Sequence, residues 1–256
     1  MEKKKTSISF VIPCFNEEKN VSLFYDKVAE TFQADLSGLE LIFVDDGSSD
    51  KTCDNLRELY EKHKDHIKVV SFSRNFGKES AMLAGLEKAI GEYTVIIDAD
   101  LQQNPKYVLI MRDFLDEHKE YDIVCCVQEE RKEGFVSKFL KKSFYHIMNN
   151  LMEVDVKDAT SDFRLMRRNV VDSILSLKES NRFSKGIFAW VGFNTFYMPY
   201  VVEERAAGTS KWGIKKLFKY AFQGIVSFSD APLVFSLKLG VFFLVASIFL
   251  FIVRFI

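Results

Sequence analysis

Two aspartates, Asp98 and Asp100, follow directly after the apolar run Tyr93–Ile97, which we expect to form a buried strand. In an open α/β sheet, ligands bind at the carboxyl ends of the strands. Two carboxylates at such a position supply the hard oxygen ligands that Mg²⁺ and Mn²⁺ prefer, and such ions also bind substrate phosphates. The motif Asp98-Ala99-Asp100 therefore predicts a site for a nucleotide-bound substrate.

Polar side chains also follow the three preceding predicted strands. Each group alone is ambiguous, because Asn16 could simply cap a helix, and at least one of Asp45 and Asp46 is expected to be structural. Four successive strand ends with polar groups at one edge of a sheet indicate a binding site much more specifically. The earlier groups are Asn16 and Glu17, then Asp45 and Asp46, then Arg74 and Lys78.

Short apolar runs alternate with longer amphipathic stretches as far as Val127. This alternation is typical of βαβ units and predicts an α/β fold with a mostly parallel sheet flanked by helices. The expected strands are Ser7–Ile12, Leu39–Val44, Lys68–Phe72, Tyr93–Ile97 and Asp122–Val127. The expected helices are Glu17–Phe32, Lys51–His63, Glu79–Ile90 and Tyr107–His118.

The bulk composition limits the class of protein. The 256 residues include 35 basic and 36 acidic side chains, so the net charge of −1 does not favour nucleic acid as a partner. The four cysteines lack zinc-ligand spacing, which indicates buried thiols in a reducing compartment. No secretory signal follows the basic start Met1–Lys5, so we expect the catalytic part to be cytosolic.

The last part of the chain is strongly apolar. Leu239–Val253 carries no charge, and Lys238 and Arg254 flank it. If both flanking side chains reach the interfaces, the stretch can span a bilayer, which needs about 20 residues. The alternative is a buried core helix, but nothing after this segment could cover so apolar a helix. We expect a transmembrane segment at 233–256, interrupted before a further membrane helix.

Two other stretches, residues 135–151 and 211–230, combine lysines with an apolar stripe at helical spacing. We expect both to be amphipathic helices in the bilayer interface. The alternative for either is a helix packed on the sheet with its lysines in solvent. The predicted organisation is a cytosolic catalytic domain at 1–210 that includes the first interface helix, followed by the second interface helix and the membrane segment.

The ordered motifs resemble those of the family 2 glycosyltransferases, which have a Rossmann-like GT-A fold. The matching runs are Val-Ile-Pro-Cys-Phe-Asn-Glu-Glu from Val11, Val-Asp-Asp-Gly-Ser-Ser-Asp from Val44, Arg-Asn-Phe-Gly-Lys from Arg74 and Asp-Ala-Asp-Leu-Gln from Asp98. Asp162–Met166 and Glu204–Trp212 look like segments of the polyprenyl-phosphate branch, which includes bactoprenol glucosyltransferases and dolichol-phosphate mannose synthase. The family often has an aspartate where this chain has Gln103.

The resemblance implies a role for each matching residue. Asp98 and Asp100 would hold Mg²⁺ or Mn²⁺ on the donor diphosphate, with Gln102 beside them. Asp162 occupies the position at which the family has its candidate base. The catalytic residues would be Asp162, Asp100 and Arg205. The nucleotide-sugar pocket would comprise Pro13, Phe15, Asn16, Glu17, Asp45, Asp46, Lys78, Asp98, Ala99 and Gln102. The phosphates of donor and lipid acceptor would meet Arg131, Arg205, Ser210 and Lys211.

The implied reaction is inverting transfer of a hexose, with UDP-glucose as the favoured donor, to a polyprenyl phosphate at the cytosolic face of the inner membrane. The partners would be the nucleotide sugar, the lipid acceptor and the membrane, without nucleic acid; a homo-oligomer stays open. One rival is a GT-A transferase for a polysaccharide or other acceptor, although no Gln-x-x-Arg-Trp motif is present. Another is a catalytically silent nucleotide-sugar-binding membrane adaptor, which the intact acidic motifs disfavour.

Overall fold

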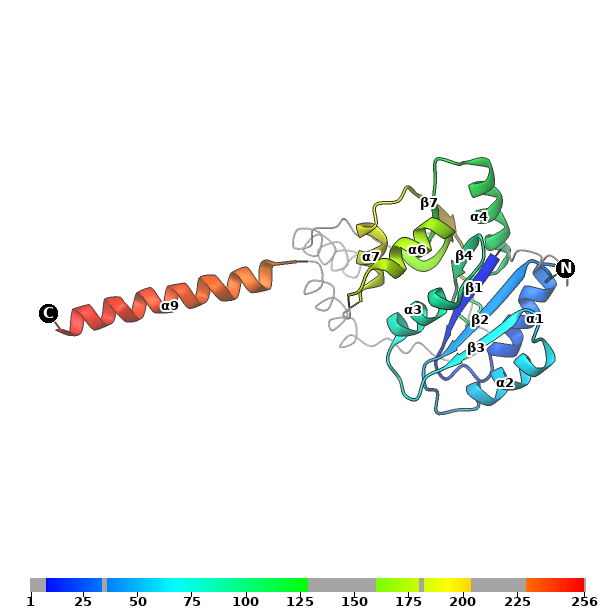
Figure 1. The fold of residues 1–256 in the computed structure, drawn as a ribbon, viewed down its shortest axis with the longest axis horizontal. Coiled ribbons are helices and arrows are strands. Elements are labelled where there is room, and N and C mark those ends of the chain that lie inside the picture. Colours follow the sequence, from blue (N-terminus) through cyan, green and yellow to red (C-terminus); the bar gives the residue numbers. More distant parts are fainter. Residues whose placement is uncertain (1–7, 34–35, 129–159, 180–181, 204–228, 256) are drawn as a thin grey trace.

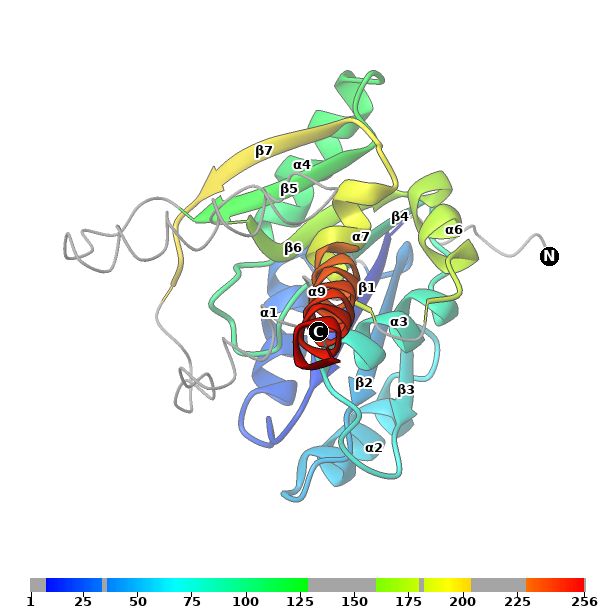
Figure 2. The same ribbon diagram turned by 90° about the vertical axis from the view of Figure 1, so that its left-hand side faces the viewer.

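A seven-stranded mixed sheet with helices on both faces forms the centre of the computed structural model, which describes residues 8–33, 36–128, 160–179, 182–203 and 229–255 (Figure 1). The strand order is β3-β2-β1-β4-β6-β5-β7, and Figure 2 shows the strands in this order from one edge to the other. The strands are β1 (Ile8–Cys14), β2 (Leu39–Asp45), β3 (Ile67–Ser71), β4 (Tyr93–Ile96), β5 (Ile123–Gln128), β6 (Thr160–Arg167) and β7 (Thr195–Tyr200).

Helices cover the two faces of the sheet because the central strands are apolar on both sides. In β2 every residue is buried; Leu41 and Phe43 face one layer, and Ile42 and Val44 face the other. The first layer contains α1 (Val21–Thr31), α2 (Thr52–Lys62) and α4 (Lys106–Glu117). The second contains α3 (Lys78–Lys88), α6 (Arg168–Ser176) and α7 (Ser184–Trp190).

The β1–β4 half of the sheet confirms the predicted parallel arrangement. β1 pairs in parallel with both β2 and β4, and β2 pairs in parallel with β3. The carboxyl ends of these strands therefore share one edge. The predicted strand boundaries agree within two residues, but α1 begins at Val21 rather than at the predicted Glu17. The residues before Val21 instead form turns that bind the loop after β2.

The other half of the sheet differs from the expected succession of parallel strands. β6 lies between β4 and β5 and is antiparallel to both, whereas β7 is parallel to β5. The sequence pattern did not predict β6, because Asp162 and Arg164 interrupt its apolar residues. These side chains lie on the face of the sheet towards α7, and this face borders the site described below.

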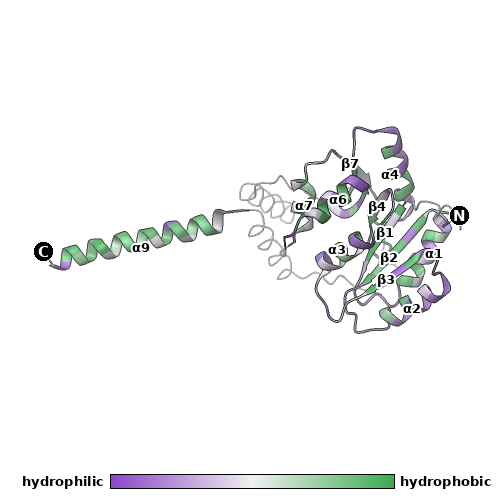
Figure 3. Cartoon of the chain, viewed as in Figure 1, coloured by the Kyte–Doolittle hydropathy of each residue, from purple (hydrophilic) through white to green (hydrophobic). Residues whose placement is uncertain are grey.

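The C-terminal helix α9 (Ala231–Phe255) extends away from the sheet and its covering helices (Figure 1). Its 22-residue segment Leu233–Arg254 is long and apolar enough to cross a membrane, and no part of its most apolar stretch is buried in the described structure. Hydrophobic residues occur all along the helix (Figure 3). Its exposure does not fit the alternative of a helix buried in a soluble core.

Candidate active site

The candidate site lies at the edge where the carboxyl ends of β1–β4 meet the start of β6. The pairing of β4 with β6 places Ile96 opposite Arg164. If this antiparallel register continues for two more residues, Asp98 faces Asp162. Two carboxylates directly opposite each other on neighbouring strands repel, so this arrangement needs a compensating positive charge.

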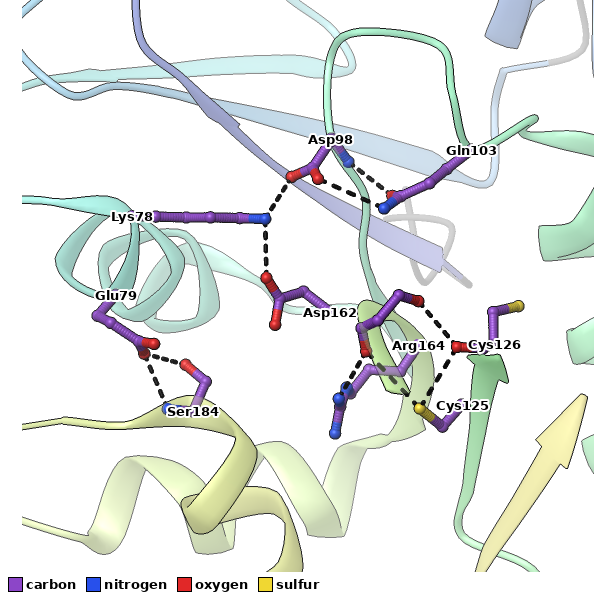
Figure 4. Close-up of polar contacts among 10 residues, drawn as sticks. Lys78, Glu79, Asp98, Gln103, Cys125, Cys126, Asp162, Arg164 and Ser184 are labelled. Atoms are coloured by element: carbon purple, nitrogen blue, oxygen red, sulfur yellow. Dashed lines mark hydrogen bonds and ion pairs between the residues drawn. The ribbon is translucent and has the colours of Figure 1, made fainter. Parts of the chain in front are cut away.

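Lys78, the first residue of α3, supplies that charge. Its Nζ lies 2.7 Å from Asp98 Oδ1 and 2.8 Å from Asp162 Oδ2 (Figure 4). Burial by itself lowers the pKa of Lys78, but the charges of Asp162 and Asp98 outweigh burial and raise the pKa above its ordinary value. The ammonium group therefore stays protonated and connects two strands and a helix through one ionic bridge.

Asp162 is held in its ionised form by the cations around it. Burial by itself would raise the pKa of Asp162, but Lys78 and then Lys185 reverse this effect and lower the pKa to about 2. The side chain is only 18% exposed. Its second oxygen, Oδ1, is buried and has no hydrogen-bond partner among the described residues. A buried carboxylate oxygen in this condition favours a ligand that donates a hydrogen bond.

The second oxygen of Asp98 faces Gln103. The Gln103 side chain accepts a hydrogen bond from Asp98 N at 2.9 Å, and its amide donates to Asp98 Oδ2 at 3.4 Å. An aspartate, the residue common at this position in the family, could not make the second contact while ionised, because a carboxylate only accepts hydrogen bonds. Gln103 thus orients the carboxylate of Asp98 without adding negative charge.

The loop after Asp98 turns sharply. Asp100 Oδ1 accepts a hydrogen bond from Gln102 N at 3.2 Å, and Gln102 Nε2 donates to Glu203 O at 3.4 Å. Leu101 has a φ of 61°, a left-handed conformation that is uncommon for a bulky side chain. Such backbone strain occurs frequently at ligand sites. The structure brings Asp98, Asp100 and Gln102 into the same tight turn.

Asp45 and Asp46 mainly organise the neighbouring loops. Asp45 accepts hydrogen bonds from Ser48 N and Ser71 Oγ at 3.1 Å each. Asp46 accepts from Phe76 N at 2.7 Å and from Gly77 N at 3.0 Å. Burial raises the pKa of Asp46, and the two backbone donors oppose that rise. Both carboxylates are buried, which confirms the prediction that at least one is structural.

Asn16 and Glu17 join the loop after β1 to the loop after β2. Asn16 Oδ1 accepts a hydrogen bond from Ser49 N at 2.8 Å, and Glu17 N donates to Thr52 Oγ1 at 2.7 Å. Asn16 does not cap α1, whose N-cap residue is Asn20. Asn16 has a φ of 54°, a left-handed backbone conformation that asparagine tolerates better than most residues. Pro13 and Phe15 are half-buried nearby in the sequence.

Arg164 is a buried charge that the sequence interpretation included in a motif without assigning it a function. It is 4% exposed, its guanidinium lies 3.6 Å from the ring centre of Phe188, and one nitrogen donates to Ser161 O at 2.8 Å. Its Nε has no partner among the described residues. Arg164 also helps to lower the pKa of Asp162, after burial and the two lysines are counted. The only feature of the sequence that pointed to a role for Arg164 was its position two residues after the predicted base, Asp162.

Several predicted site residues lie outside the described residues. They are Arg131, Arg205, Ser210 and Lys211, together with the predicted interface helix at 135–151 and residues 211–228 of the second one. The acceptor side of the site therefore stays a prediction. The described residues include the predicted donor side and Asp162.

The donor side has ligands that suit a divalent cation completed by phosphate and water. The described residues contain no group of three or more His, Cys, Asp or Glu side chains that could hold a metal ion by themselves. Asp98, Asp100 and Gln102 offer hard oxygens, and Mg²⁺ usually binds only one or two carboxylates in addition to water and phosphates. Asp98 already contacts a cation, the Lys78 ammonium, so positive charge is favourable at this position.

Two solved structures with a similar fold are sugar transferases. A mannosyltransferase from Pyrobaculum calidifontis, in complex with GDP-Man and Mn²⁺, superposes with a TM-score of 0.59 at 20% identity, over 85% of this chain and 61% of that one. Glucosyl-3-phosphoglycerate synthase from Mycobacterium tuberculosis, in complex with Mn²⁺, UDP and glucosyl-3-phosphoglycerate, gives a TM-score of 0.55 at 19% identity, over 86% and 77% of the two chains. The fold is therefore that of the GT-A glycosyltransferases.

Sequence similarity identifies the family more specifically than the fold does. Residues 9–175 match Glycosyl transferase family 2, and the chain belongs to this family. It is 40% identical to the putative glycosyltransferase CsbB of Bacillus subtilis, over 99% of this chain and 76% of that protein. It is 37% identical to the bactoprenol glucosyl transferase of Shigella phage SfV, over 94% and 77% of the two chains. The protein is thus a glycosyltransferase, as its motifs predicted.

Proposed function

We propose that this glycosyltransferase moves a hexose from a nucleotide sugar to a polyprenyl phosphate at a membrane surface. The observation that carries the proposal is the pair Asp98–Asp162, joined by Lys78 at an edge that also holds Asp100. The similarity to a bactoprenol glucosyl transferase supports the lipid acceptor. The apolar α9 supports a location at the membrane, and we propose the cytosolic face of the inner membrane.

The donor is proposed to be UDP-glucose, with its diphosphate at Asp98, Asp100 and Gln102. A Mg²⁺ or Mn²⁺ ion bound there would neutralise negative charge on the departing diphosphate. Pro13, Phe15, Asn16 and Glu17, with the Asp45–Asp46 loop, would hold the nucleoside. Because the Asn16 and Asp46 contacts join three strand-end loops, these loops would provide a rigid floor for the nucleotide.

The acceptor side is proposed to use cations from the later part of the chain. Arg131, Arg205, Ser210 and Lys211 would contact the phosphates of donor and lipid. A guanidinium group suits this task because it can bind a phosphate through two N–H groups at once. The proposed organisation keeps a catalytic domain at 1–210, an interface helix at 211–230 and a membrane segment at 233–256.

Asp162 is proposed to orient a substrate hydroxyl rather than to remove a proton. A phosphate monoester has a second pKa of about 6, so the attacking oxygen is already largely ionised at neutral pH. A carboxylate with a pKa of about 2 is also a weak base at that pH. Oδ2 binds Lys78, while the buried Oδ1, which has no hydrogen-bond partner among the described residues, would accept a hydrogen bond from the donor sugar.

Two substitutions of Asp162 test this role. Asp162→Asn keeps an oxygen that can accept a hydrogen bond, whereas Asp162→Ala keeps none. An orienting role predicts measurable turnover for the Asn variant throughout pH 6–9, and at least about tenfold less for the Ala variant. An obligatory base predicts equal, near-complete loss in both variants while UDP binding stays intact, and that result would contradict the orienting role.

A donor screen tests the function as a whole. The full chain in detergent is incubated with undecaprenyl phosphate, Mg²⁺ or Mn²⁺, and labelled UDP-glucose, UDP-galactose, UDP-N-acetylglucosamine or GDP-mannose. Labelled sugar in the organic extract is the expected product, greatest with UDP-glucose and absent with Asp100→Asn. Transfer only to water-soluble acceptors would overturn the lipid assignment. Binding of UDP without transfer from any donor would favour the silent adaptor.

A further inference from the structure

Two carboxylates with different proposed tasks share one ammonium group. The donor proposal assigns Asp98 to the divalent cation, and Asp162 to the sugar, yet Lys78 binds both. The side chains of Lys78 and Asp98 are 33% and 32% exposed, against 18% for Asp162. The contact between Lys78 and Asp98 is therefore the one that solvent ions reach more readily.

The contact at Asp98 competes with metal binding. A divalent cation about 2.1 Å from Asp98 Oδ1 would lie close to the Lys78 ammonium, which is 2.7 Å from the same oxygen, and the two positive charges would repel. The other oxygen, Oδ2, faces the amide of Gln103, which the Asp98 backbone N–H also binds. Repulsion between the two cations therefore favours movement of Lys78 away from Asp98 when a metal binds this carboxylate.

We propose that Lys78 is an exchangeable placeholder for the divalent cation. Without metal it neutralises both carboxylates, and on metal binding it leaves Asp98 while it keeps its contact with Asp162. The inference rests on the proposed function, since it assumes a metal at Asp98 and Asp100. Its physical basis is the contact of one ammonium group with both carboxylates, since two negative side chains this close together require a positive charge between them in either state.

The exchange has a direct consequence for the donor. Lys78 carries three N–H donors, and the contacts with Asp98 and Asp162 occupy two of them. Release from Asp98 makes one of these donors available for an oxygen of the nucleotide diphosphate. Metal binding and phosphate binding then favour each other, because the same movement of Lys78 serves both.

Direct measurement of Mn²⁺ binding tests the exchange without relying on turnover. The full chain in detergent is titrated with Mn²⁺, with and without UDP, and free Mn²⁺ is followed by electron paramagnetic resonance. Lys78→Gln removes the competing ammonium, so we expect its Mn²⁺ affinity without UDP to rise about tenfold. Lys185→Gln is the matched control. It removes the same charge from the surroundings of Asp162, and we expect an increase below about threefold.

The outcomes separate the exchange from the proposed function. Equal affinities of the two glutamine variants, or weaker binding by Lys78→Gln, would overturn the exchange. If Asp98→Asn leaves Mn²⁺ binding unchanged, or if no binding occurs even with UDP, the metal site itself is wrong. If Asp98→Asn weakens binding while the glutamine variants behave alike, only the exchange is wrong.

A second variant keeps the test decisive if Lys78→Gln does not fold. Lys78→Arg preserves the charge and can hold Asp98 through two parallel N–H groups. The exchange then predicts Mn²⁺ binding about threefold weaker than in the wild-type protein, because the competitor is stronger. Unchanged or tighter binding by Lys78→Arg would contradict the placeholder role.

Discussion

The loops after β2 and β4 both carry aspartates at the same edge of the sheet, yet their carboxylates are neutralised in different ways. Asp45 and Asp46 receive hydrogen bonds from backbone N–H groups and from the hydroxyl of Ser71 at the end of β3. Asp98 and Asp162 face a single long side chain, Lys78. Backbone donors cannot leave without moving the loop, whereas a lysine can change rotamer. The first pair therefore maintains a shape, and the second is suited to exchange its counter-ion.

The largest expected contrast concerns stability. Asp46→Ala leaves the N–H groups of Phe76 and Gly77 without their ionised acceptor, and we expect the free energy of unfolding to fall by about 3 kcal/mol. Asp98→Ala leaves Lys78 paired with Asp162, so we expect a fall below about 1 kcal/mol. Chemical denaturation of both variants in detergent, followed by circular dichroism, measures the difference.

Asp45→Asn is a useful control for this comparison, since its amide retains an oxygen for Ser48 N but loses the charge. We expect the free energy of unfolding of Asp45→Asn to fall by an amount between those of Asp46→Ala and Asp98→Ala. Similar losses for Asp46→Ala and Asp98→Ala would show that the Asp98 carboxylate is as structural as Asp46, and the contrast between the two loops would be lost.

Removal of the shared cation should have a smaller effect that a second change reverses. Lys78→Met leaves Asp98 and Asp162 without the cation that they share, and we expect the free energy of unfolding to fall by about 2 kcal/mol, less than for a fully buried pair because Lys78 is 33% exposed. Adding Asp162→Asn to Lys78→Met removes one of the repelling charges and should recover about half of the loss. The same denaturation assay measures both.

The double variant supplies the decisive comparison. If Asp162→Asn destabilises the Lys78→Met protein further, the two carboxylates do not repel each other there, and the charge argument fails. Combining Lys78→Met with Asp116→Asn, which lies on α4 away from Lys78, should bring no recovery.

The smallest expected effect is a pH dependence. The pKa of Asp162 is about 2 in the folded chain and 3.8 in its ordinary state, so its ionisation stabilises the fold fully above pH 4. This contribution decreases as the pH falls towards 2, and about 1 kcal/mol should be lost by pH 3. Denaturation of the wild-type protein and Asp162→Asn between pH 7 and 3 should show that the variant lacks this component. An equal pH dependence of both proteins would contradict the low pKa.

Part of the site could be predicted because its residues are local in sequence. Asp98 and Asp100 follow an apolar strand, and the parallel half of the sheet results from βαβ units, whose periodicity is visible in the chain. The structural role of Asp45 or Asp46 was also expected from turn chemistry. These features depend on neighbours within a few residues, so a single sequence is enough to suggest them.

The bridge between Asp98 and Asp162 could not be predicted in the same way. β6 has no continuous apolar pattern, because one of its faces carries Asp162 and Arg164 towards the site. Its insertion between β4 and β5 depends on pairing over long sequence separations. Lys78 was predicted as a pocket cation, but its position between two carboxylates follows only from that pairing.

The start of α3 has a mechanical consequence. Lys78 binds Asp98 in the loop after β4 and Asp162 in β6, and the next residue, Glu79, accepts hydrogen bonds from the backbone N–H and the hydroxyl of Ser184 at the start of α7. Gly77, with a φ of 97°, precedes both and is tied to Asp46. The start of α3 is thus attached to the loop after β2, to the pair Asp98–Asp162 and to α7. A displacement of α3 at this edge of the sheet would therefore also pull on α7, where Phe188 packs against Arg164.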